Sequence, residues 1–219
     1  MAALAATAIA MTVAVQAPAK ADAGDLQVRL RGLGIIPTGE SGGIQPALGG
    51  ASLRAKPNAI PELDLTYFVT DNIGVELILG TSRHQVKGQG AIAGLGNVAD
   101  VWLLPPTLTL QYHFQPEAAF RPYVGAGINY TFFYGEDADG SLVNAIGATK
   151  VQATNSLGLA LQAGFDYDLG NNWVVNFDLK YIRLDTNVFL ENAIGTQRTD
   201  LDINPLIIGV GVGYRFNLL

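Results

Sequence analysis

The feature that most constrains this chain is a two-residue alternation of side-chain character that recurs in eight segments. A period of two is typical of β-strands whose two faces meet different surroundings. In the last segment, large apolar residues such as Leu206 and Ile208 alternate with small ones such as Gly209 and Gly211. The eight predicted strands span residues 26–35, 62–69, 73–80, 107–114, 124–134, 157–167, 173–182 and 206–216.

Aromatic residues favour a membrane barrel over a soluble sandwich or barrel. If the first strand begins on the periplasmic side and successive strands reverse direction, the aromatics gather at two levels. The periplasmic band holds Tyr67, Tyr112, Phe114, Phe165, Tyr167, Trp173, Tyr214 and Phe216, and the outer band holds Trp102, Tyr130, Phe132, Tyr134 and Tyr181. Two aromatic girdles around an aliphatic belt are typical of outer-membrane barrels. A soluble lipocalin-like barrel would need a polar exterior instead.

The connections between strands have two distinct lengths. Short turns are predicted at residues 70–72, 115–120 and 170–172, and long, Gly-rich, acidic links at 37–59, 84–100, 135–155 and 183–198. Between Asp22 and Leu219 no run reaches 18 uninterrupted apolar residues, which excludes a helical membrane protein. The predicted fold is all-β: an eight-stranded antiparallel transmembrane β-barrel of the outer-membrane type, with short periplasmic turns and long extracellular loops.

The N-terminal segment reads as an export signal. Residues 1–15 carry no charge and are mostly aliphatic, and Ala19-x-Ala21 fits a cleavage site. We therefore expect a signal peptide over residues 1–21 and one barrel domain over 22–219, although an Ala-rich helix of the folded domain is an alternative. The net charge of −6 argues against a nucleic-acid partner, and the lack of cysteine excludes thiolate metal sites and thiol catalysis.

Several segments resemble the outer membrane protein W (OmpW) family. They are residues 71–76 (DNIGVE), 104–108 (LPPTL), 111–114 (QYHF), 121–127 (RPYVGAG), 172–173 (NW), 178–181 (DLKY) and 209–216 (GVGVGYRF). The resemblance implies an integral protein of the Gram-negative outer membrane that passes or captures small hydrophobic molecules, with alkane-uptake, AlkL-like proteins among its relatives. The partners we expect are outer-membrane lipids and lipopolysaccharide, small hydrophobic solutes, and the barrel-assembly machinery during insertion.

The predicted inward positions differ in polarity with depth. Toward the outer end they form an apolar cup of Leu33, Ile35, Ile78, Leu103, Ile182, Ile203 and Ile207. Deeper positions form a polar plug that includes Arg29, Arg31, Asp64, Glu76, His113, Asp178, Lys180 and Arg215. Charges inside a narrow barrel must pair, so the plug is expected to block a straight aqueous path. It either only fills the barrel or serves a proton-linked or ion-conducting role.

Four prolines suggest a sideways exit. Pro61, Pro105, Pro106 and Pro205 lie near the outer ends of predicted strands, where each removes a donor from the β-ladder. A locally unpaired wall would form a lateral gate that releases an apolar molecule into the bilayer. The alternative is that these prolines only start strands and prevent slippage.

Catalytic and cofactor motifs are weak in this sequence. Residues 39–43 match G-x-S-x-G but lie in a predicted loop rather than at a strand-to-helix turn. His84 is a candidate for rim catalysis with Asp100, Asp137 and Asp139, and residues 88–93 and 136–140 match nucleotide and calcium motifs only loosely. We expect no enzyme, no cofactor and no metal site. Two functions remain open: uptake of hydrophobic molecules, or a structural or surface-receptor barrel without transport.

Overall fold

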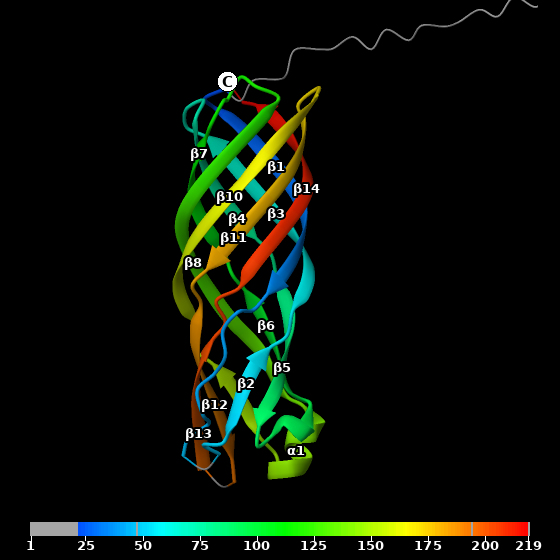
Figure 1. Cartoon of the computed structure of the whole chain (residues 1–219), viewed down its shortest axis with the longest axis vertical. Helices are drawn as coiled ribbons and strands as arrows, with labels where there is room; N and C mark the ends of the chain where they lie inside the picture. The colour runs from blue at the N-terminus through cyan, green and yellow to red at the C-terminus, as the bar shows by residue number, and fades with distance from the viewer. Residues whose placement is uncertain (1–21, 47, 194, 219) are drawn as a thin grey trace, which may run out of the picture.

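The computed structural model describes residues 22–46, 48–193 and 195–218, so the predicted signal peptide lies outside the described residues. Eight antiparallel strands close into a barrel (Figure 1), in the order β10-β11-β14-β1-β3-β4-β7-β8 with β8 returning to β10. Their bounds are β1 (Asp25–Ile36), β3 (Asn58–Phe68), β4 (Ile73–Leu79), β7 (Thr107–His113), β8 (Phe120–Ala138), β10 (Ser156–Gly170), β11 (Trp173–Ile182) and β14 (Leu206–Asn217). The predicted eight-stranded antiparallel barrel is confirmed.

The short connections fall at the end of the barrel that holds the C-terminus (Figure 1). The turn between β10 and β11 contains Asn171 and Asn172 at φ angles of 54° and 68°. Asparagine tolerates this left-handed region better than most residues, because its short polar side chain bonds locally. Local sequence therefore fixes the tight periplasmic turn.

The long outer links are not irregular loops but a second tier of structure that continues the barrel beyond its opposite end (Figure 1). They contain β2 (Ala51–Ala55), β5 (Ser82–Gly90), β6 (Asn97–Leu104), β9 (Lys150–Ala153), β12 (Asp185–Asn192) and β13 (Gly195–Asp202), with a 3₁₀ turn η1 (Ala93–Leu95) and a short helix α1 (Gly140–Ile146). We call this tier the extension. Among the described residues, no helix is long and apolar enough to cross a membrane.

Two walls make up the extension. One wall runs β2-β5-β6 onto the long outer end of β8, and the other is the sheet β13-β12-β9. The segment after β1 joins them, because the amide of Ser41 donates to Leu53 on β2 while Ser41 also bridges to Leu201 on β13. Pairing between sequence-distant segments therefore continues the barrel outward.

The outward surface changes character between the two tiers. On the barrel it is apolar: Leu30, Leu110 and Leu159 are each about 60% exposed, which suits contact with lipid. On the extension it is polar: Arg54, Arg83, Lys87, Gln152 and Arg198 are exposed on their strands. The barrel is thus the membrane-spanning part, and the extension lies in the water outside it.

Candidate functional site: an apolar cavity above a polar plug

Arg29 on β1 is the centre of the charged network inside the barrel. Its guanidinium lies 3.0 Å from Asp64 Oδ2 and 2.9 Å from Glu76 Oε1. Its other terminal nitrogen lies 3.2 Å from Asp166 Oδ1. All four side chains are at most 1% exposed. Three strands are therefore tied to β1 through one arginine.

Arg31, two residues further along β1, forms a second set of contacts on the same face. Its Nε donates to Glu62 Oε1 at 2.7 Å, and its Nη2 lies 2.6 Å from Asp64 Oδ2. Glu76 also accepts hydrogen bonds from Thr109 at 2.7 Å and Gln162 at 2.8 Å. Asp64 and Glu76 each have several partners while Glu62 is paired with Arg31, and such pairing is the condition for keeping charge away from water.

The network continues toward the periplasmic end. Asp168 lies 3.3 Å from Arg121 and 3.8 Å from Arg215, and Arg215 donates to Gln27 at 3.1 Å. The ring of His113 bonds to Gln111 Oε1 at 2.9 Å. These contacts fill the lower barrel with paired side chains rather than open space.

All eight residues of the predicted plug are buried to 2% exposure or less. The prediction omitted Glu62, Arg121, Tyr123 and Asp168, which belong to the same network. The strand alternation could have identified two of them, because residues two apart on a strand share a face. Glu62 lies two residues before Asp64, and Asp168 lies two residues after Asp166.

Glycines on β14 make room for the two central arginines. A Cβ at Gly213 would lie 2.6 Å from Arg29 Cγ, and one at Gly211 would lie 2.7 Å from Arg31 Cγ. Neither contact is tolerated between carbon atoms. The Gly-x-Gly-x-Gly pattern of β14 therefore accommodates the long side chains of β1, its hydrogen-bonded neighbour.

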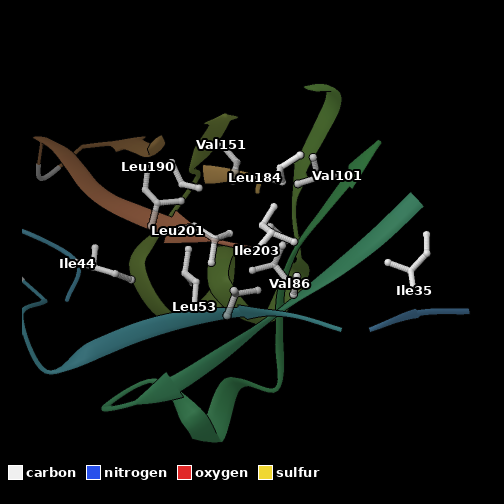
Figure 2. Close-up of a cluster of buried hydrophobic side chains, with 14 of the residues drawn as sticks. Ile35, Ile44, Leu53, Val86, Val101, Val151, Leu184, Leu190, Leu201 and Ile203 are labelled. Carbon is white, nitrogen blue, oxygen red and sulfur yellow. The ribbon is translucent and has the colours of Figure 1, made fainter. Parts of the chain in front are cut away.

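Above the plug lies an apolar cavity of about 90 Å³. Figure 2 shows several of its side chains converging from both walls of the extension, among them Leu53, Val86, Val101, Leu201 and Ile203. Polar side chains are rare in its lining, namely Ser82, His84 and Thr186. The volume is several times the roughly 10–15 Å³ that one water needs, and an apolar space of this kind stays dry or takes an apolar guest.

Five of the seven residues predicted for the cup line this cavity: Ile35, Leu103, Ile182, Ile203 and Ile207. Leu33 is buried in the same apolar cluster but is not in the lining. Ile78 is buried at 4% exposure and belongs to neither set. Residues of the upper wall were not predicted, because they lie in segments interpreted as loops; they include Leu53, Val86, Val151 and Leu190.

His84 on β5 faces the cavity rather than a catalytic cluster. Its Nε2 lies 3.0 Å from Ser82 Oγ, and burial lowers its pKa below the ordinary value of 6.5 despite a backbone hydrogen bond to Lys56. Asp100, the expected partner, instead pairs with Arg83 at 3.1 Å on the outer surface. In the part of the chain that the structure describes, no group of three or more His, Asp or Glu residues could hold a metal ion.

The prolines occupy different parts of the wall. Pro105 and Pro205 line the cavity. Pro105 and Pro106 separate β6 from β7, and β6 pairs with β5 while β7 pairs with β4. Between the pairs Ile78–Thr107 and Ser82–Leu103, residues 79–81 and 104–106 form no described ladder pairs with one another. This stretch is a gap in the backbone pairing beside the cavity.

Pro61 lies on the neighbouring strand beside the same gap. A Cβ at Gly80 would lie 3.7 Å from the carbonyl oxygen of Pro61. The wall at Pro205, in contrast, stays bonded, because the amide of Ile182 donates to the Pro205 carbonyl at 3.2 Å. Three of the four predicted gate residues therefore surround one gap, and the fourth lies in a continuous part of the wall.

Comparison with known proteins agrees with this architecture. The OmpW family model matches residues 22–216. The chain belongs to the OmpW family. It is 46% identical over 191 residues to an uncharacterized outer-membrane protein, y4mB, of Sinorhizobium fredii, covering 87% of this chain and 79% of the relative.

Two solved structures of this kind are similar along nearly their whole length. The crystal structure of OprG from Pseudomonas aeruginosa is 30% identical with a TM-score of 0.84, covering 90% of this chain and 98% of that one. The solid-state NMR structure of AlkL in lipid bilayers is 30% identical with a TM-score of 0.71, covering 91% and 93%. The protein is an outer-membrane β-barrel, and its family consists of barrel proteins rather than enzymes.

Proposed function

We propose that this barrel captures small hydrophobic molecules in its outer cavity and releases them sideways into the outer membrane. The observation that carries the proposal is the cavity lining, which is almost wholly apolar although it faces the aqueous side of the protein. A barrel with only a structural role has no need of a dry space there. The family resemblance to alkane-uptake proteins supports the same ligand class.

The polar plug argues against a straight path. An apolar molecule that crossed the layer of Arg29 and Arg31 would have to separate buried ion pairs, at a cost of several kcal/mol. Eight-stranded barrels also have interiors filled by side chains rather than aqueous channels. Passage through the lower barrel is therefore unfavourable.

The gap beside Pro105 offers the alternative exit. Neither Pro105 nor Pro106 has an N–H to offer β4 or β5, so opening the wall there breaks few backbone bonds. The hydroxyl of Thr81 donates to the Leu103 carbonyl at 3.1 Å and is one of the contacts across this stretch. The lateral gate would form where the cavity and the apolar outer surface of the barrel come closest.

The experiment is uptake of octane into cells with an intact outer membrane, with and without the protein, and with barrel folding checked by heat-modifiable gel mobility. A small sugar serves as a polar control for leakage. The proposal predicts faster octane entry and unchanged sugar entry. Unchanged octane entry with a folded barrel would support the structural or surface-receptor function instead, and faster sugar entry would show that the plug does not seal.

A further inference from the structure

The junction between the cavity and the plug holds a buried lysine with no hydrogen-bond acceptor. Lys180 is 1% exposed, and among the described residues its Nζ makes no hydrogen bond. Its ion pair with Asp178 Oδ1 is 3.6 Å long, which exceeds hydrogen-bond distance. An ammonium group carries three donors, and leaving them unused away from water is costly.

The side chain directly opposite Lys180 has an acceptor oxygen that receives no hydrogen bond. Gln162 on β10 is in register with Lys180 on β11 and is 5% exposed. Its amide nitrogen donates to Glu76 Oε2 at 2.8 Å, while its Oε1 accepts nothing among the described residues. A donor and an acceptor without partners thus lie on adjacent strands, where directly opposite Cβ atoms are about 5 Å apart.

This pair lies directly below the cavity lining, although neither residue lines the cavity itself. Along β11 the inward residues run from Asp178 of the plug through Lys180 to Ile182 of the cavity lining. On β14 the residue opposite Lys180 is Ile207, which also lines the cavity. A chain-like guest in the cavity would therefore bring its inner end toward these two polar groups.

The chemistry of the pair selects the end group of such a guest. Lys180 needs an acceptor and Gln162 needs a donor, and a hydroxyl supplies both. A carboxylate could accept from Lys180 but could not donate to Gln162. The buried side chains already include seven carboxyl groups against five basic groups, namely Asp25, Glu62, Asp64, Glu76, Asp166, Asp168 and Asp178 against Arg29, Arg31, Arg121, Lys180 and Arg215. A further negative charge is therefore disfavoured.

We propose that Lys180 and Gln162 form a head-group site for a primary aliphatic alcohol, whose hydroxyl accepts from Lys180, donates to Gln162, and leaves the hydrocarbon chain in the cavity. This inference rests on the proposed function and narrows its ligand class. The site gives a hydroxylated chain an advantage over the bare alkane, because only the alcohol satisfies both buried groups.

The test is NMR of the folded protein labelled with ¹⁵N-lysine, in which the Lys180 Nζ signal is assigned by its loss in Lys180→Met. Octane, 1-octanol and octanoate are titrated separately. We expect 1-octanol to shift the Lys180 signal and octane to leave it in place. The proposal is overturned if octane shifts the signal equally or if octanoate gives a stronger response. It is also overturned if 1-octanol gives no response, which would leave water as the partner of Lys180.

Variants supply a second readout. Lys180→Met should weaken 1-octanol binding about tenfold while octane binding is unchanged, because only the alcohol loses a charge-assisted hydrogen bond. Gln162→Met should act in the same direction and serves if Lys180→Met does not fold. Lys87→Met, at an exposed position on β5, is the matched control and should change neither. Equal loss of both ligands in Lys180→Met contradicts a head-group site.

A transport measurement tests the head-group site and the proposed uptake function independently. If wild type and Lys180→Met carry octane and 1-octanol equally well into lipid vesicles, uptake stands and the head-group site fails. If 1-octanol binds at Lys180 but the protein moves neither compound, the head-group site stands and the proposed uptake function fails.

Discussion

The barrel and the extension use the same two-residue alternation with opposite polarity. In the barrel, the inward face carries Arg29 and Asp64 while the outward face carries Leu30 and Leu63. In the extension, the inward face carries Val86 and Val101 while the outward face of β5 carries Lys87. The solvent explains the reversal, since lipid favours an apolar exterior and water a polar one. The two tiers thus enclose a charged plug below and an apolar cavity above.

The two interiors also differ in how they respond to damage. The plug is stabilised by a connected set of charges. Removing one of them leaves several others without an ion-pair partner. The cavity is bounded by dispersion contacts and already contains space, so single changes are absorbed locally. Variants in each region should therefore differ in how much stability or uptake they lose.

Removing the central arginine should damage the barrel most. Arg29→Met leaves Asp64, Glu76 and Asp166 without their shared cation, and we expect a loss of about 3–5 kcal/mol in the free energy of unfolding, or failure to fold. Urea unfolding in lipid vesicles measures it. The control is Arg54→Met, whose exposed pair with Glu40 is 3.7 Å long and contributes at most about 1 kcal/mol. Equal losses in both variants would contradict a connected plug.

Filling the cavity should strongly reduce uptake with little effect on the plug. Val86→Trp places a large ring in a space of about 90 Å³. We expect octane uptake to fall roughly tenfold because the guest loses its apolar volume. Gln85→Trp, on the outward face of the same strand, is the matched control and should leave uptake unchanged. The cavity would not be the binding site if Val86→Trp folded and transported octane normally.

Restoring backbone donors at the gap should slow lateral release. The double variant Pro105→Thr and Pro106→Thr supplies two N–H groups to the unpaired stretch. We expect octane uptake to fall a few fold, which corresponds to about one net hydrogen bond. Pro205→Thr is the control, since that part of the wall is already bonded through Ile182. If the control slowed uptake as much as the double variant, the gap would not be the exit.

The smallest expected effect is a dependence on pH through His84. Because burial lowers the pKa of His84 in the folded protein below 6.5, the unfolded chain binds more protons than the folded one just below that pH. Stability is therefore full above pH 6.5 and falls as the pH drops toward the folded pKa. Unfolding of His84→Gln at several pH values should show a flatter profile in this window. An unchanged slope would mean that His84 does not carry the dependence.

Part of the candidate site followed from the sequence. The alternation in segments such as residues 206–216 predicted the eight strands, and the inward positions of Arg29, Asp64 and Glu76 predicted the plug. Ile35, Ile182 and Ile207 line the cavity for the same reason, since each lies on a strand that the alternation identified, whereas Leu103 and Ile203 lie just before predicted strands. Local periodicity is enough for these positions because it is a property of each strand alone.

The extension was beyond this reasoning. Strand β5, for example, contains Gly88 and Gly90 beside the charged Lys87, so its composition favoured a loop. These segments become strands by pairing with neighbours, both in local hairpins such as β12–β13 and across longer separations in sequence, as where β9 pairs with β12 and β6 with β8. Such pairing depends on where the barrel strands end and the outer segments begin. The sequence of a single segment does not show which other segment lies beside it.

The period of two in the sequence and the cost of unpaired charge were enough to predict the eight spanning strands and the charged interior. The tertiary structure was needed to show that the outer links form a second tier, that this tier encloses an apolar cavity, and that Lys180 Nζ and Gln162 Oε1 lie on adjacent strands beneath it without hydrogen-bond partners among the described residues. Periodicity shows that a strand has two faces, but which face lies inside depends on the solvent around it and the strands beside it.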